Sequence, residues 1–149
     1  MTDLFDRILF LKKCSIFSEV ITDDLRYVAQ ALEEGVFHAG DHVFDINDQG
    51  DYLYLVTKGK IGISIDPDPS KKEFIGFIGS GEAFGEMSLI DHLPRSATAY
   101  VIEDTEVLTL EKSRLRVLLL SYPEIVFGMM RALSLRIREN HARNALMRK

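Results

Sequence analysis

The stretch that decides the fold reads GSGEAFGEMSLIDHLPRSATAY and covers residues 79–100. Arg95 is the single base in the segment 73–111, which holds eight acidic residues. Just before it, residues 85–90 predict one short helical turn that follows a glycine bend. The free amides at a helix N-terminus carry partial positive charge and suit an anion. An arginine close to that turn adds a planar fork of donors, so we expect a phosphate site.

The residues near Arg95 indicate which class of ligand the predicted site could bind. Ser96 offers one more hydrogen-bond donor to an anion. Glu86 would repel a phosphate at close range, so we expect it to accept hydrogen bonds from ligand hydroxyls instead. These groups together predict a pocket for a sugar phosphate. The alternative is that Arg95 simply forms an ion pair with Glu86 or Asp91, which needs no ligand.

Length and composition predict one domain over residues 1–149. The hydrophobic share of 46% and the charged share of 28% are ordinary for a globular chain. The single cysteine, Cys14, excludes an internal disulfide. The chain lacks a signal-peptide pattern and an apolar run of about 18 residues, so we expect a cytoplasmic protein.

Without a nucleophile–base pair or a cluster of metal-ligating residues, we expect no enzyme activity, no metal and no cofactor.

Charge is unevenly distributed along the chain. Residues 1–111 hold nine Lys/Arg and 21 acids, whereas residues 112–149 hold nine Lys/Arg and two acids. An acidic body repels polyanions, so we expect no direct nucleic-acid binding by this domain. The basic C-terminal segment either lies against the acidic body or contacts a polyanion.

Apolar spacing predicts helices at both ends of the chain. Thr2-Asp3 caps a first helix, and a second begins at Thr22 and stops at Gly35. A helix from Ser113 to about Ser121 precedes a long helix that starts at Pro123.

The last helix carries an apolar stripe that advances by four, three and four residues: Val126, Met130, Leu133 and Ile137, continued by Asn140 and Asn144. This stripe either packs on the chain's own domain or forms a two-stranded coil with a second copy, in which a buried Asn sets the register.

Residues 36–111 alternate short apolar runs with turn residues. Strands are predicted at 36–37, 42–46, 52–57, 60–65, 73–78, 98–101 and 106–110, with a turn at Lys58-Gly59. Ile61, Ile63 and Ile65 alternate with polar or small residues, as in a half-buried antiparallel strand. Short strands at this spacing predict a small β-sandwich or barrel.

Two motifs closely resemble the phosphate-binding cassette of cyclic-nucleotide-binding domains, the family of the catabolite activator protein and the kinase regulatory subunits. These motifs are FGEMSL at residues 84–89 and PRSAT at residues 94–98. The resemblance covers nearly the whole chain, because residues 16–17, 40–41, 50–56 and 58–60 also fall at the family's turn and strand positions.

The resemblance implies an α+β fold, an antiparallel β-roll or jelly-roll barrel flanked by N-terminal helices and a long C-terminal helix. The helices would occupy residues 1–35 and 113–149, and the roll residues 36–111, with the cassette at 81–98. It also implies a set of ligand-binding residues: Phe84, Gly85, Glu86, Met87, Ser88, Arg95, Ser96 and Ala97. On the last helix, position along the chain after Pro123 adds Asn140, whose amide can both donate and accept. Glu86 would accept the ribose 2′-hydroxyl, Arg95 would pair with the cyclic phosphate, and Asn140 would approach the base.

The predicted function is a regulatory domain that binds a cyclic nucleotide and signals through its C-terminal helix. Ser96 resembles the residue of the catabolite activator protein, which favours cyclic AMP, although its hydroxyl also suits the guanine of cyclic GMP. We expect a homodimer through the C-terminal helix and an effector domain outside this chain. The alternative is a domain that keeps the fold and serves mainly for dimerisation or docking.

Overall fold

The computed structural model describes residues 3–147, which belong to two compact units. The roll unit is Ala31–Leu115, and the helical unit combines Thr2–Gln30 with Arg116–Lys149. Thr2, part of the predicted first cap, lies outside the described residues.

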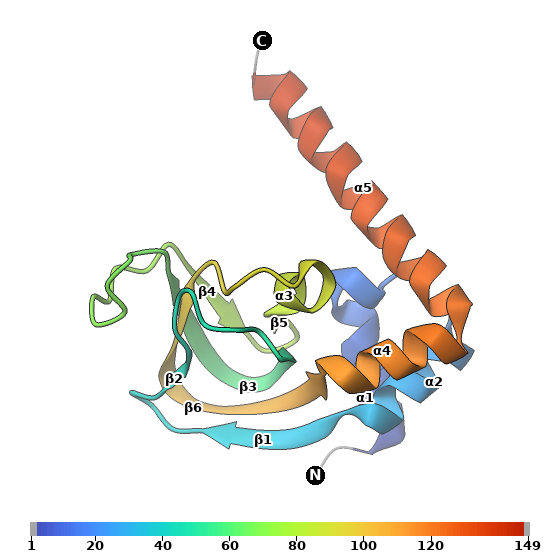
Figure 1. The fold of residues 1–149 in the computed structure, drawn as a ribbon, viewed down its shortest axis with the longest axis horizontal. Helices are drawn as coiled ribbons and strands as arrows, with labels where there is room; N and C mark the ends of the chain where they lie inside the picture. The colour runs from blue at the N-terminus through green and yellow to red at the C-terminus, as the bar shows by residue number, and fades with distance from the viewer. Residues whose placement is uncertain (1–2, 148–149) are drawn as a thin grey trace. The chain divides into compact units, whose positions relative to one another are not determined.

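The roll unit is a six-stranded antiparallel sheet in the order β1-β6-β3-β4, with β2 paired to β6 and β5 paired to β3. The strands are β1 (Glu33–Phe37), β2 (His42–Phe44), β3 (Tyr52–Ser64), β4 (Gly76–Gly79), β5 (Ala83–Phe84) and β6 (Thr98–Glu111), and the short helix α3 is Glu86–Asp91. Figure 1 shows the long strands β3 and β6 side by side. The predicted antiparallel roll with N-terminal helices and a long C-terminal helix is therefore confirmed.

The core of the roll is apolar and comes from both long strands. It consists of Tyr54, Val56, Ile61, Phe84, Ala99, Val101 and Val107, against which Phe37, Val43, Phe44, Ile63 and Ile78 pack. Of the alternating isoleucines, Ile61 is fully buried and Ile63 half-buried, whereas Ile65 lies beyond the end of β3 and is exposed.

The turn predicted at Lys58-Gly59 is wrong, because β3 runs through it as one strand. Gly59 has a φ of +115°, and the register between β3 and β6 shifts around it, so these residues form a bulge. A Cβ at Gly59 would lie 2.4 Å from Thr105 Oγ1. The two strands predicted at 98–101 and 106–110 are likewise one continuous strand, β6. The strand predicted at 73–78 corresponds to β4, which begins only at Gly76.

The predicted end of the second helix at Gly35 is also wrong. The helix stops at Ala31, and Gly35 pairs with Val107 inside β1. A Cβ on Gly35 would lie 3.3 Å from Val107 Cγ2, so this glycine permits close packing of β1 on β6. The roll consequently begins at Glu33, three residues before the predicted boundary.

The helical unit contains the helices from both ends of the chain. They are α1 (Leu4–Lys13), the 3-10 helix η1 (Ser15–Phe17), α2 (Thr22–Ala31), most of α4 (Lys112–Ser121) and α5 (Pro123–Met147). Asp3 caps α1 by accepting a hydrogen bond from the Asp6 amide. Tyr27 and Tyr122 stack with ring centroids 4.0 Å apart at the junction of α4 and α5.

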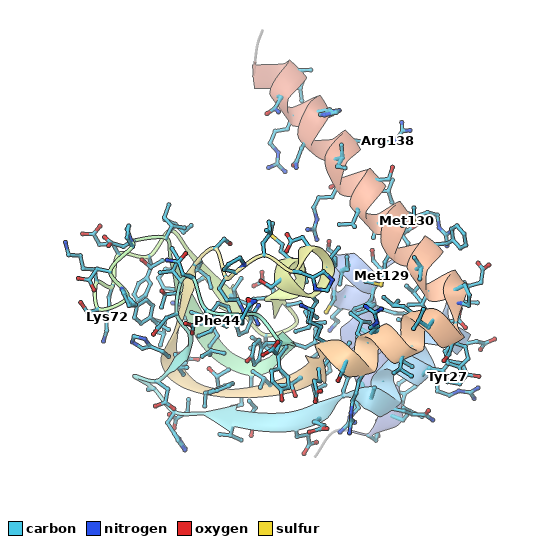
Figure 2. The ribbon with its side chains drawn as sticks, in the orientation of Figure 1. Tyr27, Phe44, Lys72, Met129, Met130 and Arg138 are labelled. Carbon is cyan, nitrogen blue, oxygen red and sulfur yellow. The ribbon has the colours of Figure 1, made fainter. Side chains whose placement is uncertain are left out.

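Helix α5 packs on η1 through a face next to the predicted stripe. Ile125, Met129 and Ala132 are buried, and a Cβ on Gly128 would lie 2.8 Å from Val20 Cγ2. Met129 and Met130, labelled in Figure 2, differ accordingly, since Met129 is 6% exposed and Met130 is 57% exposed.

The stripe of α5 is therefore largely uncovered by its own chain. Val126 and Leu133 are half-buried, whereas Met130 and Ile137 are exposed. Self-packing mainly uses the neighbouring face and covers the stripe only in part, so the structure does not decide between the two sequence interpretations.

Among residues 3–147, no single helix is long and apolar enough to cross a membrane. The pair α4–α5 reaches that length and composition only when the two are taken together, and it is bent by 110°.

Candidate functional site

A cavity in the roll unit gathers the cassette residues predicted from the sequence. Its lining is Phe44, Ile63, Ile78, Ala83, Phe84, Gly85, Glu86, Met87, Ser88, Arg95, Ser96 and Ala97. All eight of the roll residues expected to bind a ligand are in this set. Four apolar lining residues, Phe44, Ile63, Ile78 and Ala83, were not predicted, because aromatic and aliphatic residues in strands are most often read as core.

The short helix α3 contributes one wall of the cavity. Gly85 precedes it with a φ of +84°, a left-handed conformation that glycine adopts without strain. A Cβ at this position would lie 2.6 Å from Arg95 Nη1. Gly85 is thus required both for the bend into α3 and for the close approach of the arginine.

Arg95 is the one charged side chain of the roll unit that is almost completely buried, with 4% exposure. Its backbone is fixed from both sides, since its amide donates to Asp48 O at 2.7 Å and its carbonyl accepts from the Asn47 amide at 2.8 Å. Its guanidinium donates through Nη1 to Gly85 O at 2.9 Å and through Nη2 to Tyr52 O at 2.7 Å. Arg95 Nε is buried without a hydrogen-bond partner.

The alternative ion pair of Arg95 with Glu86 or Asp91 does not form. Within the described part of the chain, the salt bridges do not include Arg95, and both of its terminal nitrogens donate to backbone carbonyls. Burial lowers the pKa of Arg95, while the nearby Tyr54, Asp51, Asp48 and Glu86 act in the opposite direction. An arginine remains protonated under such conditions, so the cavity contains a fixed positive charge.

Two aromatic rings border the guanidinium. Phe44, labelled within the roll in Figure 2, has its ring centroid 4.1 Å from Arg95 Cζ. Tyr54 lies farther away, at 6.0 Å, and stacks on Phe84 with centroids 5.0 Å apart. The cation therefore lies between an aromatic ring and two carbonyl oxygens.

Asn140, the ninth predicted residue, lies on α5 in the helical unit, where it is exposed. A second, open groove runs beside it on the same helix. The groove is lined by Met130, Leu133, Ser134, Ile137, Arg138 and His141. The role of Asn140 toward a ligand stays a prediction.

Metal-ligating side chains do not gather anywhere in residues 3–147, where no group of three His, Cys, Asp or Glu could hold an ion. His42 instead pairs with Asp45, with Nδ1 and Oδ1 2.7 Å apart, and its ring meets Tyr100 edge-on. Cys14 is buried and donates to Phe10 O.

Comparison with known proteins gives the same type of domain. The family model described as cyclic nucleotide-binding domain matches residues 34–122. The cyclic AMP receptor protein of Thermus thermophilus is 30% identical over 129 residues, which cover 87% of this chain and 60% of that protein. A cAMP-dependent protein kinase regulatory subunit of Debaryomyces hansenii is 31% identical over 104 residues, covering 70% of this chain and 22% of that subunit.

A solved structure agrees with these relatives. The N-terminal domain of a transcriptional regulator from Streptomyces coelicolor superposes with a TM-score of 0.78 at 29% identity, and the match covers 88% of this chain and 94% of that one. The curated relatives are longer, since this chain spans 60% of the Thermus protein and 22% of the kinase subunit.

Proposed function

Because the chain belongs to the cyclic nucleotide-binding domain family, we propose that it is a regulatory domain that binds cyclic AMP in the roll cavity and reports occupancy through α5. One observation carries this proposal. A buried guanidinium with an unpaired Nε lines the same cavity as Glu86 and Ser96. Such a donor lacks a hydrogen-bond acceptor, which is destabilising for a buried N–H. An anion bound in the cavity would supply one.

Each part of the ligand has a group that suits it. The cyclic phosphate meets Arg95, Ser96 and the amides of Met87, Ser88 and Ala97. The ribose 2′-hydroxyl donates to the carboxylate of Glu86. The base lies against the apolar lining, and the role predicted for Asn140 is to offer a donor and an acceptor to its edge.

The names of two relatives support the choice of cyclic AMP, since one is a cyclic AMP receptor protein and the other a subunit of a cAMP-dependent kinase. Ser96 also suits cyclic GMP, so selectivity between the two is an outcome of the test below.

The direct test is calorimetric titration with cyclic AMP, cyclic GMP and AMP. We expect cyclic AMP to bind best, and AMP to bind about tenfold or more weakly near pH 7.5, because its phosphate carries nearly two charges. Three acids, Asp48, Asp51 and Glu86, lie close enough to act on Arg95 and would repel the second charge. As pH falls below the second phosphate pKa of about 6, AMP should gain affinity while the cyclic diester, which keeps one charge, should not.

Two results would change the proposal. Preference for cyclic GMP would keep the function and replace the ligand. Absence of binding by all three nucleotides would favour the second function, a domain that keeps the fold for dimerisation or docking.

The uncovered stripe of α5 supports a second copy of the chain as a partner. Met130 and Ile137 are 57% and 55% exposed, and they line the groove on this helix. Two-stranded coiled coils bury apolar stripes at a and d positions like this one. A ligand that favours one position of α5 would then shift the dimer equilibrium by its difference in affinity for the two states, and an effector outside residues 1–149 would respond.

We expect Ile137→Glu to convert the dimer to monomers, because a carboxylate in an apolar seam is left without a partner. The matched control is Leu135→Glu, which introduces the same charge at an exposed position on the opposite side of α5, since two residues turn a helix by about 200°. Sedimentation equilibrium with and without cyclic AMP measures both effects. A parent that stays monomeric, or a control that dissociates equally, would contradict the role of the stripe.

A further inference from the structure

The guanidinium of Arg95 has an unusual allocation of its donors. Nη1 and Nη2 each use one N–H on a backbone carbonyl, those of Gly85 and Tyr52. These two bonds hold one edge of the planar group, but a plane held along one edge can still tilt. Nε, on the other edge, is buried and unpaired.

Phe44 supplies the contact that the carbonyls do not. Its ring centroid lies 4.1 Å from Arg95 Cζ, within the range in which an aromatic face attracts a guanidinium. Arg95 Cζ lies over this ring, which limits how far the guanidinium can move on that side. Phe44 is itself held in place, since it packs on Tyr54 and Phe84 with centroids 6.0 and 5.9 Å away.

We infer that Phe44 is a positioning residue for anion recognition, which fixes the plane of the Arg95 guanidinium so that the N–H donors it does not use on backbone carbonyls are held ready for a phosphate oxygen. This inference rests on the proposed function. It adds Phe44 of β2, which lies outside the cassette, to the residues that determine affinity for the cyclic nucleotide. Preorganisation of a charged donor raises affinity because the order is present before the ligand arrives.

Phe37 provides a matched control. It is also a half-buried phenylalanine that packs on the roll core, and it meets Tyr54 edge-on at 6.1 Å. It does not line the cavity, and the cation–π contacts of Arg95 involve Phe44 and Tyr54. Phe37→Leu and Phe44→Leu therefore make the same chemical change in the same core, and only the second changes the cavity, where it removes both the ring next to Arg95 and a lining side chain.

The experiment measures cyclic AMP affinity by calorimetry and stability by thermal melting for the parent, Phe37→Leu, Phe44→Leu and Phe44→Tyr. We expect the two leucine variants to lose similar stability, and only Phe44→Leu to bind about tenfold more weakly. Phe44→Tyr keeps an aromatic face and should restore affinity. Phe44→Met, whose flexible unbranched side chain fills an irregular gap better than leucine does, replaces the leucine variant if that variant does not fold.

A spectroscopic measurement on the free protein separates positioning from direct contact with the ligand. The Arg95 Nε–H resonance, assigned by its loss in Arg95→Lys, should exchange slowly with water in the parent and in Phe37→Leu. It should exchange faster in Phe44→Leu.

Unchanged affinity of Phe44→Leu would overturn the inference. Weaker binding with an unchanged Nε–H exchange rate would also overturn it, because Phe44 would then act by touching the ligand. If the parent binds no cyclic nucleotide, the proposed function fails, while the exchange rates still report whether Phe44 holds the guanidinium.

Discussion

Arg95→Ala should bind cyclic AMP more weakly by about 2–5 kcal/mol, the range found when one partner of a buried charged pair is removed. This loss corresponds to roughly 30-fold to several-thousand-fold in affinity. The reason is that the alanine leaves the phosphate charge in a cavity without its cation. The structure adds a second expected effect on stability, because the Gly85 and Tyr52 carbonyls lose their donor. Both hydrogen bonds are only part-buried, so we expect each to contribute about 1 kcal/mol.

Two further variants make this result specific. Arg95→Lys keeps the charge but cannot reach both carbonyls with a planar fork, so it should recover only part of the affinity. Arg114→Ala removes an arginine of the same unit that pairs with Glu33 at the surface, with Nη1 3.0 Å from Oε1. It should bind like the parent. Calorimetry at a temperature where all variants are folded provides the measurement, and parental affinity in Arg95→Ala would refute the phosphate assignment.

The fold follows from the sequence where local chemistry decides it. Pro123 begins α5 and Asp3 caps α1, as expected from their backbone preferences. Two of the errors lie where a glycine serves tertiary packing and not a turn. Gly35 and Gly59 read as a helix stop and a turn, yet both lie inside strands, where a Cβ would meet Val107 and Thr105. Those contacts join residues far apart in the chain, so local sequence carries no signal for them.

In the candidate site, too, local sequence predicts some features, whereas contacts between residues far apart in the chain decide others. Eight of the nine predicted ligand residues line one cavity because they are close together in the chain and the cassette motif orders them. The partners of Arg95 could not be predicted, since they are backbone carbonyls 10 and 43 residues away. Periodicity found the apolar stripe of α5, but it could not tell which of two adjacent faces packs on η1.

Gly50→Ala is the second substitution for which we expect a large effect, here on both the stability of the domain and its binding of cyclic AMP. Gly50 is buried, and a Cβ there would lie 2.3 Å from Ser88 Cβ and 2.9 Å from Arg95 Cζ. Neither neighbour can give way easily, because Ser88 belongs to α3 and Arg95 is held by two carbonyls. Overpacking of this kind costs about 1–3 kcal/mol. The same displacement moves the cation and the helix that line the cavity, so we expect affinity for cyclic AMP to fall by about tenfold or more.

Gly76→Ala is the matched control for this substitution. A Cβ at Gly76 would meet nothing within 4 Å, and its φ is not in the left-handed region. Because alanine restricts the unfolded chain more than glycine does, this variant should be as stable as the parent or slightly more stable, and it should bind equally well. Thermal melting and calorimetry on both variants test the pair. Parental affinity in a folded Gly50→Ala would mean that the cavity tolerates movement of α3 and Arg95, and that their placement next to Gly50 does not determine ligand binding.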